Sequence, residues 1–326
     1  MALIMQAVRD FRRSAPSVRF RHMTKRAIDL VDGTTFRARP KPNPGGPTSA
    51  FYEQRGYAIL RNAIDRRKID VLRTALEAEV IASDGAFLRH KSVKREPNVF
   101  LPGTRIPNDG LLNPHGQPET GRTAAAIESL LLTDSVADLL TSIDGARNYT
   151  VHQTIVFFMP PGTHLHIDGW GFDTEPRGFA HTLWIPLEAV GRHNGPVAIV
   201  PWPRGKVVSP AELGVAEPSE PPDGSRRPHK AYHAALEGYL REDAPDVVAP
   251  DLDPGDLVAF ASTTPHRTLP FQSPSRWAMQ VLVRPSNLRW GSWPEFAVGL
   301  SSSPKDPWRW LKQVGPRWRI ISSVAA

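Results

Sequence analysis

The prevailing spacing of hydrophobic and polar residues changes near residue 145 of this chain. Before that point, apolar residues recur at helical spacing within residues 65–80 and within residues 124–143. Asp65 directly precedes the first stretch and is placed to cap it as a helix. Beyond residue 145, short apolar runs bounded by turn residues take over, which is typical of strands. We predict strands at residues 57–60, 149–158, 182–187, 197–200, 257–260 and 277–283.

Helices at the front of the chain and strands behind them predict a mainly β fold with flanking helices. Several short strands in succession favour a jelly roll, a cupin-like pair of facing sheets with the helices packed outside one of them. Because 326 residues can bury one large core, we expect a single domain over residues 51–326. Residues 1–50 are rich in basic residues, proline and glycine, so we expect an arm that ends in a linker.

Two long stretches of the predicted domain lack a regular pattern. Residues 85–122 are rich in proline and glycine, and residues 201–250 form a proline-rich insertion with one helical piece at 229–240. We expect both stretches to cover the mouth of the barrel. The first one favours an anionic substrate because it carries Lys91, Lys94, Arg95 and Arg105. A Trp- and Arg-rich C-terminal extension begins at about residue 286.

Composition narrows the class of protein further. The chain has no cysteine, which excludes disulfides and thiolate metal sites. No run reaches the ~20 apolar residues of a membrane helix, and arginines interrupt the apolar N-terminus before a signal-peptide core forms, so we expect a cytoplasmic protein. The net charge of +7 and the C-terminal Trp and Arg residues are compatible with nucleic-acid binding. No recognised nucleic-acid module accompanies them, so we expect a small-molecule partner; the oligomeric state is not predicted.

The candidate chemistry begins at His164-Leu-His-Ile-Asp168, which follows an apolar strand. In an extended segment, residues two apart point to the same side, so His166 and Asp168 would present a nitrogen and a carboxylate oxygen to one point. A third ligand is available downstream at His266, after a turn and a buried strand. Two histidines and one carboxylate on one face of Fe(II) leave the other positions open for a cosubstrate and dioxygen.

Arg276 strengthens this interpretation. It stands at the head of the apolar run at residues 277–283, a short distance after His266. An arginine fork suits bidentate capture of the far carboxylate of a dicarboxylic acid. A surface salt bridge is the alternative role, and the apolar run after Arg276 argues against it.

These residues, with two further segments, resemble the phytanoyl-CoA dioxygenase family of Fe(II)- and 2-oxoglutarate-dependent oxygenases. The further segments are Thr182-Leu-Trp-Ile-Pro-Leu-Glu188 and Asn194-Gly-Pro-Val-Ala-Ile-Val-Pro201. The opening at residues 51–63 is also similar to the N-terminal entry of that family. The resemblance covers roughly residues 51–285.

The resemblance implies a double-stranded β-helix in which iron is bound by His166, Asp168 and His266. It implies that Arg276 binds 2-oxoglutarate, and Gln153 matches a glutamine that lies beside this cosubstrate in similar enzymes such as the ectoine hydroxylases. The implied reaction consumes O2 and decarboxylates 2-oxoglutarate to succinate and CO2. Coupled to it, a small-molecule metabolite is hydroxylated, or desaturated or cyclised.

Asp168 also bears on the type of reaction. In relatives that halogenate, a small residue at the carboxylate position leaves room for chloride on the iron, so a filled position favours hydroxylation. His164 would face the same side as the ligands, and we expect it to contact substrate or to support a ligand. Trp170 and Trp184 would line the substrate pocket, or else belong to the core.

Two other classes of protein fit parts of the pattern. A non-catalytic jelly-roll protein would use the same barrel only to bind a ligand, although every residue expected for iron and 2-oxoglutarate is present. A cupin-type isomerase or hydrolase would use His164 and His166 together. Such a site needs a carboxylate a few residues further on; Asp168 is too close, and Glu175 falls in a loop.

Overall fold

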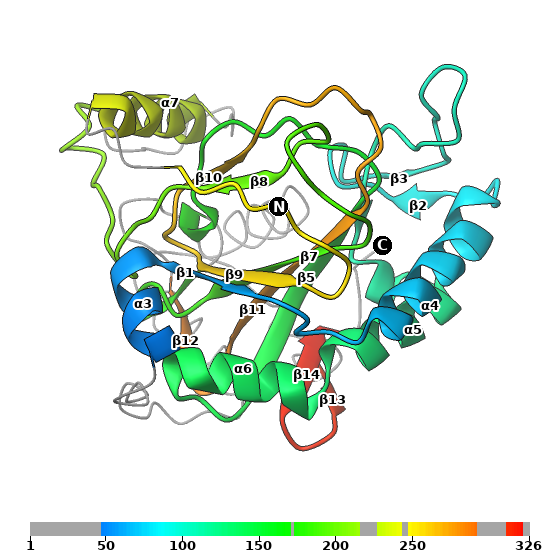
Figure 1. The fold of residues 1–326 in the computed structure, drawn as a ribbon, viewed down its shortest axis with the longest axis horizontal. Coiled ribbons are helices and arrows are strands. Elements are labelled where there is room, and N and C mark those ends of the chain that lie inside the picture. Colours follow the sequence, from blue (N-terminus) through cyan, green and yellow to red (C-terminus); the bar gives the residue numbers. More distant parts are fainter. Residues whose placement is uncertain (1–46, 171–172, 216–226, 243–246, 292–310, 322–326) are drawn as a thin grey trace, which may run out of the picture.

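The computed structural model describes residues 47–170, 173–215, 227–242, 247–291 and 311–321. Its centre is a large sheet with strand order β1-β9-β7-β11-β5-β14-β13, and β4 pairs with β5 beside this path (Figure 1). All of its pairings are antiparallel except β14 with β5. The strands are β1 (Tyr57–Leu60), β4 (Leu111–Leu112), β5 (Tyr149–Phe157), β7 (His181–Pro186), β9 (Leu257–Ala261), β11 (Ala278–Pro285), β13 (Leu311–Val314) and β14 (Trp318–Ile321).

A second, small sheet faces the large one. It consists of β8 (Val197–Ile199) and β10 (His266–Thr268), paired in antiparallel fashion. Side chains of β8 pack against Trp184, Val258 and Phe260 of the large sheet in one apolar cluster. We call the side of the large sheet that carries these residues the inner face. Two more pairs stand apart, β2 (Phe87–Leu88) with β3 (Arg95–Glu96), and β6 (Asp173–Glu175) with β12 (Arg289–Gly291).

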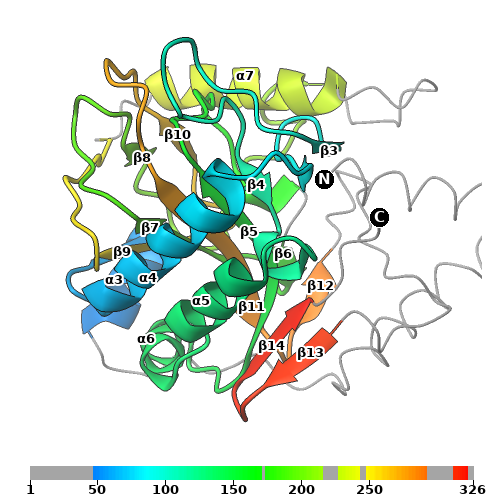
Figure 2. The same cartoon turned by 90° about the vertical axis from the view of Figure 1, so that its right-hand side faces the viewer.

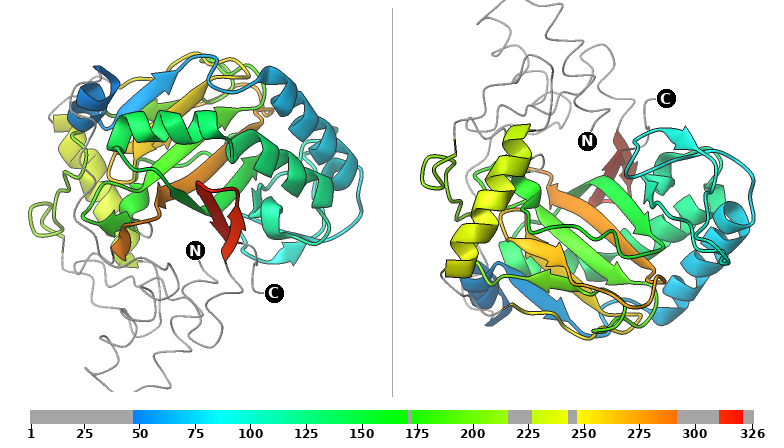
Figure 3. Two further views of the ribbon diagram at one scale, coloured as in Figure 1. Left: turned by 90° about the horizontal axis from the view of Figure 1, so that it is seen from below. Right: turned by 90° about the horizontal axis from the view of Figure 1, so that it is seen from above.

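Helices cover the other side of the large sheet, the outer face. They are α3 (Pro47–Arg55), α4 (Arg66–Leu76), α5 (Gly121–Leu131) and α6 (Asp134–Asp144). Seen from below, α5 and α6 cross in front of the strands (Figure 3). Their apolar residues join those of the outer face in the main core cluster. As predicted, the Asp65 side chain caps α4, by accepting a hydrogen bond from the backbone N–H of Arg67 at 2.9 Å.

The helix predicted within residues 124–143 is two helices. The chain leaves the helical conformation at Leu132, and α6 then starts anew behind its own cap, Thr133, whose hydroxyl accepts from the N–H of Val136 at 3.3 Å. Gly145 ends α6 with a φ of 76°, a conformation that favours glycine. The expectation of one continuous helix was therefore wrong, because the cap in its middle was not recognised.

The two irregular stretches contain more structure than expected. Residues 85–122 hold the β2–β3 pair, β4 and the short 3-10 helix Pro114–Gly116, so their interpretation as one long loop was wrong. The helix predicted at 229–240 is confirmed as α7 (Arg227–Glu242). It lies on the opposite side of the large sheet from α5 and α6 (Figure 2). Within the described residues, no helix is both long and apolar enough to cross a membrane.

The predicted strands are confirmed, and the mainly β class with flanking helices is confirmed with them. The described end of the C-terminal extension adds the β13–β14 hairpin to the large sheet, with Trp318 and Ile320 buried. The predicted N-terminal arm lies almost wholly outside the described residues, and the division of the chain into arm, domain and extension stays a prediction.

Candidate active site

The two histidines predicted as ligands lie side by side between the facing sheets. His166 and His266 form an isolated antiparallel bridge. The N–H of His166 donates to the carbonyl of His266 at 3.0 Å, and the N–H of His266 donates back at 2.9 Å. Segments far apart in the sequence thereby bring two imidazole rings to a centroid distance of 4.2 Å.

Backbone carbonyls set the orientation of both rings. Nδ1 of His166 lies 2.8 Å from the carbonyl oxygen of His164, and Nδ1 of His266 lies 3.0 Å from that of Thr264. Because a carbonyl oxygen only accepts, each Nδ1 carries the proton and each Nε2 keeps its lone pair. This is how protein histidines are usually prepared for binding a metal.

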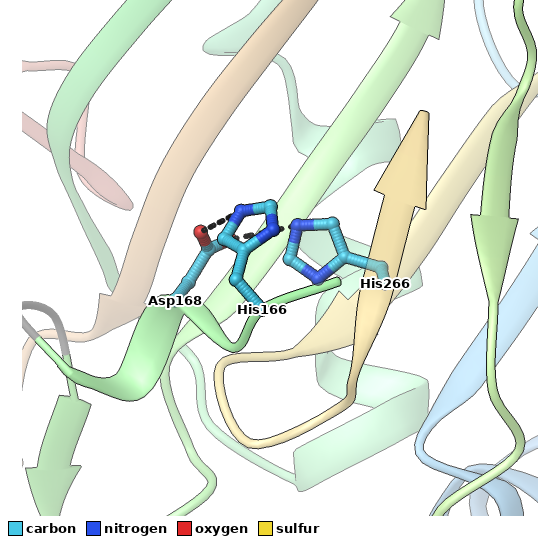
Figure 4. A group of neighbouring side chains, drawn as sticks. All are labelled: His166, Asp168 and His266. Carbon is cyan, nitrogen blue, oxygen red and sulfur yellow. Dashed lines mark ion pairs between the residues drawn. The ribbon is translucent and has the colours of Figure 1, made fainter. Parts of the chain in front are cut away.

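The carboxylate of Asp168 completes the group. Its oxygens lie 3.7 Å from Nε2 of His166 and 3.8 Å from Nε2 of His266. Figure 4 shows the three side chains converging, and their ligand atoms all lie within 4.8 Å of one another. The hydroxyl of Thr182 donates a hydrogen bond to Asp168. The N–H of Gly169 donates to Ser262 at 2.7 Å, which fastens the turn after the carboxylate.

The protonation of these groups suits a divalent cation. Burial lowers the pKa of His266 to about 4, with His166 lowering it further and Asp168 opposing the shift. His266 is therefore a neutral imidazole at pH 7, the form that binds metals. Two imidazoles and one carboxylate, with no thiolate in the chain, are a donor set that fits Fe(II).

The inner face of the large sheet forms the floor beneath this group. Directly paired residues on neighbouring strands point to the same side, so each set of partners makes one row. The row nearest the ligands, here called the Thr182 row, consists of Gln153, Leu282, Thr182 and Phe260. Thr182 holds Asp168, and the Phe260 ring lies 4.5 Å from that of His266. The next row, the Trp184 row, consists of Ile155, Gln280, Trp184 and Val258.

Arg276 lies over the part of the inner face beyond the Thr182 row. Its guanidinium carbon is 5.2 Å from the Trp184 ring centroid and 5.8 Å from that of Phe157. Thr182 and Trp184 are two residues apart on β7, which corresponds to about 7 Å along the strand. The cation therefore stands over the row next to the one that Asp168 contacts.

The guanidinium is buried without its full set of acceptors. Arg276 is 1% exposed, and one terminal nitrogen donates to the carbonyl of Gly195 at 3.1 Å. Nε and the other terminal nitrogen are buried and have no hydrogen-bond partner in the part of the chain that the structure describes. Burial lowers the pKa of Arg276 to about 10, with Glu188 opposing the shift, so it remains a cation at pH 7. Two free donors on a buried cation fit a carboxylate.

The structure places the remaining predicted site residues in different surroundings. Gln153 lies in the Thr182 row, and Trp184 lies beneath Arg276, at 3% exposed. His164 is exposed, and its carbonyl oxygen, not its ring, positions His166. Trp170 belongs to the short 3-10 helix that begins at Asp168, and its side chain is outside the described set.

Sequence reasoning did not single out two polar residues of the inner face. Thr182 was quoted only as part of a motif, although a hydroxyl two residues before a buried Trp on a strand lies on the same face as that Trp. Gln280 was passed over inside an apolar run. Its even spacing from Arg276 was the signal that it shares the inner face.

Helix α7 supports the ligand segment from behind. Leu165 and Ile167 alternate with the ligands and pack against Tyr232 and Leu236 of α7. The N–H of Ile167 points to Nε2 of His233 at 3.5 Å, and the His233 ring is 5.9 Å from that of His166. One turn further, Glu237 lies 3.7 Å from Arg267, the neighbour of His266. The insertion thus touches both ligand segments, and its expected role as a lid stays a prediction.

Comparison with known proteins adds a family and a fold. The family model described as phytanoyl-CoA dioxygenase (PhyH) matches residues 52–278. The structure of EctD from S. alaskensis with 2-oxoglutarate and 5-hydroxyectoine is 18% identical, with a TM-score of 0.51 over 81% of this chain and 86% of that one. The non-heme alpha-ketoglutarate dependent carbocyclase SnoK from nogalamycin biosynthesis is 16% identical, with a TM-score of 0.50 over 74% and 84%.

At these identities the likeness to solved structures concerns the fold. It identifies the two facing sheets as the predicted jelly roll, or double-stranded β-helix. A search of curated protein sequences finds no match.

Proposed function

Because this chain belongs to the phytanoyl-CoA dioxygenase family, we propose that it is an Fe(II)- and 2-oxoglutarate-dependent dioxygenase that hydroxylates a small-molecule metabolite. One observation carries the proposal. A His-Asp-His group and a buried arginine, two of whose donors have no partner among the described residues, lie over neighbouring rows of the inner face of one sheet. A structural role alone explains neither the convergence of the ligands nor the unsatisfied cation.

One set of residues would bind the metal and another the cosubstrate. His166, Asp168 and His266 would hold Fe(II) on one side and leave the other positions open. Arg276 would bind the far carboxylate of 2-oxoglutarate, and Gln153 would lie beside the cosubstrate. Bound together, Fe(II), 2-oxoglutarate and O2 supply oxidative decarboxylation to succinate and CO2, coupled to oxidation of a C–H bond. The Trp184, Phe157 and Phe260 rings exclude water from one wall of this space.

The class of reaction follows from Asp168. This carboxylate is held by Thr182 in the ligand group, so halide has no vacant protein position to occupy. We therefore propose hydroxylation, with desaturation or cyclisation as variants of the same chemistry, over halogenation. The similar structures support a small-molecule substrate, since one contains 5-hydroxyectoine and the other is a carbocyclase of nogalamycin biosynthesis.

The substrate is expected to be small and anionic because the stretch at 85–122 is basic. Arg95 is engaged there in an ion pair with Glu119, and the Lys91 ammonium donates to the carbonyl of Asn108 at 3.2 Å. Lys94 forms no ion pair with the residues that the structure describes, so it remains a candidate for meeting an anionic group.

Succinate release tests the proposal. Purified protein with Fe(II), 2-oxoglutarate and O2 should release succinate, and release should increase when a true substrate is present. Product should carry one oxygen from O2 or lack two hydrogens, and it should carry no chlorine at high chloride. Binding of a small molecule without any succinate would instead support the non-catalytic jelly-roll class.

A further inference from the structure

Two strands at the centre of the large sheet each contain a single residue that is not fully buried. In β5 this residue is Gln153, and in β11 it is Gln280. Both lie on the inner face, Gln153 in the Thr182 row and Gln280 in the Trp184 row. The inner face is therefore accessible above these two glutamines and closed along the rest of both strands.

The strand register places the two side chains close together. Gln153 pairs with Leu282, and Gln280 is two residues from Leu282 on the same strand. Diagonal neighbours of this kind are about 7–8 Å apart, which is within reach of long side chains. The two amides thus belong to one small area of the inner face.

Gln280 lies in the row of the inner face over which the Arg276 guanidinium stands. It is the direct partner of Trp184, the residue over whose ring the Arg276 guanidinium lies at 5.2 Å. The ligand group lies instead over the Thr182 row. A dicarboxylate that extends from the metal to Arg276 would therefore end at the row that contains Gln280.

Neither the side-chain amide of Gln153 nor that of Gln280 forms a hydrogen bond with any residue that the structure describes. Gln117, a buried glutamine elsewhere in the same protein, shows the contrast. Its oxygen accepts from the N–H of Leu88 at 2.8 Å, and its nitrogen donates to the carbonyls of Leu112 and Leu88 at 2.9 and 3.3 Å. Gln280 therefore presents both a donor and an acceptor to the space above the sheet.

We infer that the Gln280 amide binds 2-oxoglutarate by donating an N–H to the carboxylate that Arg276 holds. A carboxylate offers about four acceptor positions, so a bidentate arginine leaves room for one more donor. An amide supplies it without adding a second buried cation. This inference rests on the proposed function and adds to it a second residue that binds the cosubstrate.

Binding of 2-oxoglutarate to the Fe(II)-loaded protein without oxygen tests the inference apart from turnover. Calorimetry should show that Gln280→Leu weakens 2-oxoglutarate binding by about ten- to a hundredfold, the range for a hydrogen bond to a charged group. Gln280→Glu has the same shape but repels the carboxylate, so it should weaken binding further. Gln313→Leu removes an exposed glutamine from β13 and should leave binding unchanged.

The controls separate the possible failures. Affinity for Fe(II) in the absence of 2-oxoglutarate should be the same in all four proteins. If the unaltered protein binds Fe(II) but no 2-oxoglutarate, the proposed function fails. If it binds 2-oxoglutarate and Gln280→Glu binds equally well, only this inference is overturned, and that comparison holds even where Gln280→Leu does not fold. Unchanged 2-oxoglutarate affinity with altered substrate affinity would equally overturn it and assign the amide to the substrate.

Discussion

The polar side chains on the two faces of the large sheet differ in how completely their hydrogen-bonding groups have partners. On the outer face, His181 lies between Tyr52 and Asp144, with both ring nitrogens 2.8 Å from a partner. Asp144 in turn accepts from the Tyr149 hydroxyl at 2.8 Å and from the N–H of Ala146 at 2.7 Å. On the inner face, Arg276 keeps two donors without partners among the described residues.

The contrast is sharpest between His181 and Thr182, which are neighbours in β7. Because a carboxylate only accepts, Nε2 of His181 donates to Asp144 and Nδ1 accepts from Tyr52, so this network is closed. Burial raises the pKa of Tyr52 and, with Asp144, that of Tyr149, which keeps both hydroxyls as donors. Thr182 on the other face holds a carboxylate that belongs to an open ligand group. Polar groups with hydrogen-bond partners stabilise the fold, whereas polar groups without partners are available to bind ligands.

The strongest test of the open face removes a ligand. His266→Ala should reduce 2-oxoglutarate turnover to background, because two protein ligands no longer define one face of the iron. Succinate formation and Fe(II) binding are the measurements. The unfolding temperature should change little, and full activity in this variant would refute the ligand assignment.

The matching test of the closed face removes the centre of its network. Asp144→Ala leaves His181 and Tyr149 with buried, unsatisfied groups, so the free energy of unfolding should fall by about 3–5 kcal/mol. Asp138→Ala on the same helix removes only an exposed ion pair with Arg317 and should cost under about 1 kcal/mol. Equal losses, measured by denaturant unfolding, would show that the outer network is not a stabilising element.

Arg276 provides the third comparison. Arg276→Ala should raise the apparent KM for 2-oxoglutarate by about thirty- to several-thousandfold, because the loss of one half of a desolvated charge pair costs about 2–5 kcal/mol. Arg276→Lys should restore little, since the planar fork is lost. Stability should not fall as it does in Asp144→Ala, because among the described residues the Arg276 side chain donates a single hydrogen bond, to the carbonyl of Gly195. An unchanged KM would place the cosubstrate anchor elsewhere.

The smallest expected effect concerns α7. His233→Leu removes the group that faces the N–H of Ile167, next to both His166 and Asp168. Changes that disturb the support of a ligand typically weaken metal binding by about tenfold or more. His233→Gln, which keeps an acceptor at this position, should retain more affinity for Fe(II) than His233→Leu, and His193→Leu, an exposed control, should retain all of it. Equal affinities in all variants would show that α7 only covers the surface.

Much of this arrangement is predictable because it depends on local spacing. Alternation along an extended segment predicted that the His166 and Asp168 side chains converge, as they do in the structure. The head of an apolar run drew attention to Arg276, whose role stays a prediction. The break between α5 and α6 was missed because Thr133, a moderate cap, lies within an otherwise continuous helical pattern. Gln280 was missed because one polar residue in an apolar strand has meaning only once the facing strands and Arg276 are placed around it.

The position of the β13–β14 hairpin in the sheet could not be predicted from local sequence patterns. The sequence showed only that the extension is rich in Trp and Arg, whereas in the structure Trp318 packs against Tyr149, with ring centroids 5.7 Å apart. That β14 lies parallel to β5 depends on a pairing between Trp318 and Tyr149 that no short-range pattern encodes.

This order of strands has a consequence for how the protein is made. Among the described strands, β1, near residue 57, pairs only with β9, near residue 257, and β5 pairs with β14 from the region of residue 318. The first of the described strands to be synthesised therefore lacks its partner through most of translation, and β5 lacks β14 on one edge for longer still. Pairing over such distances has a high entropic cost of loop closure, so folding should be slow. Because waiting strands with exposed edges are prone to aggregation, low temperature or chaperones during expression should raise the yield of folded protein.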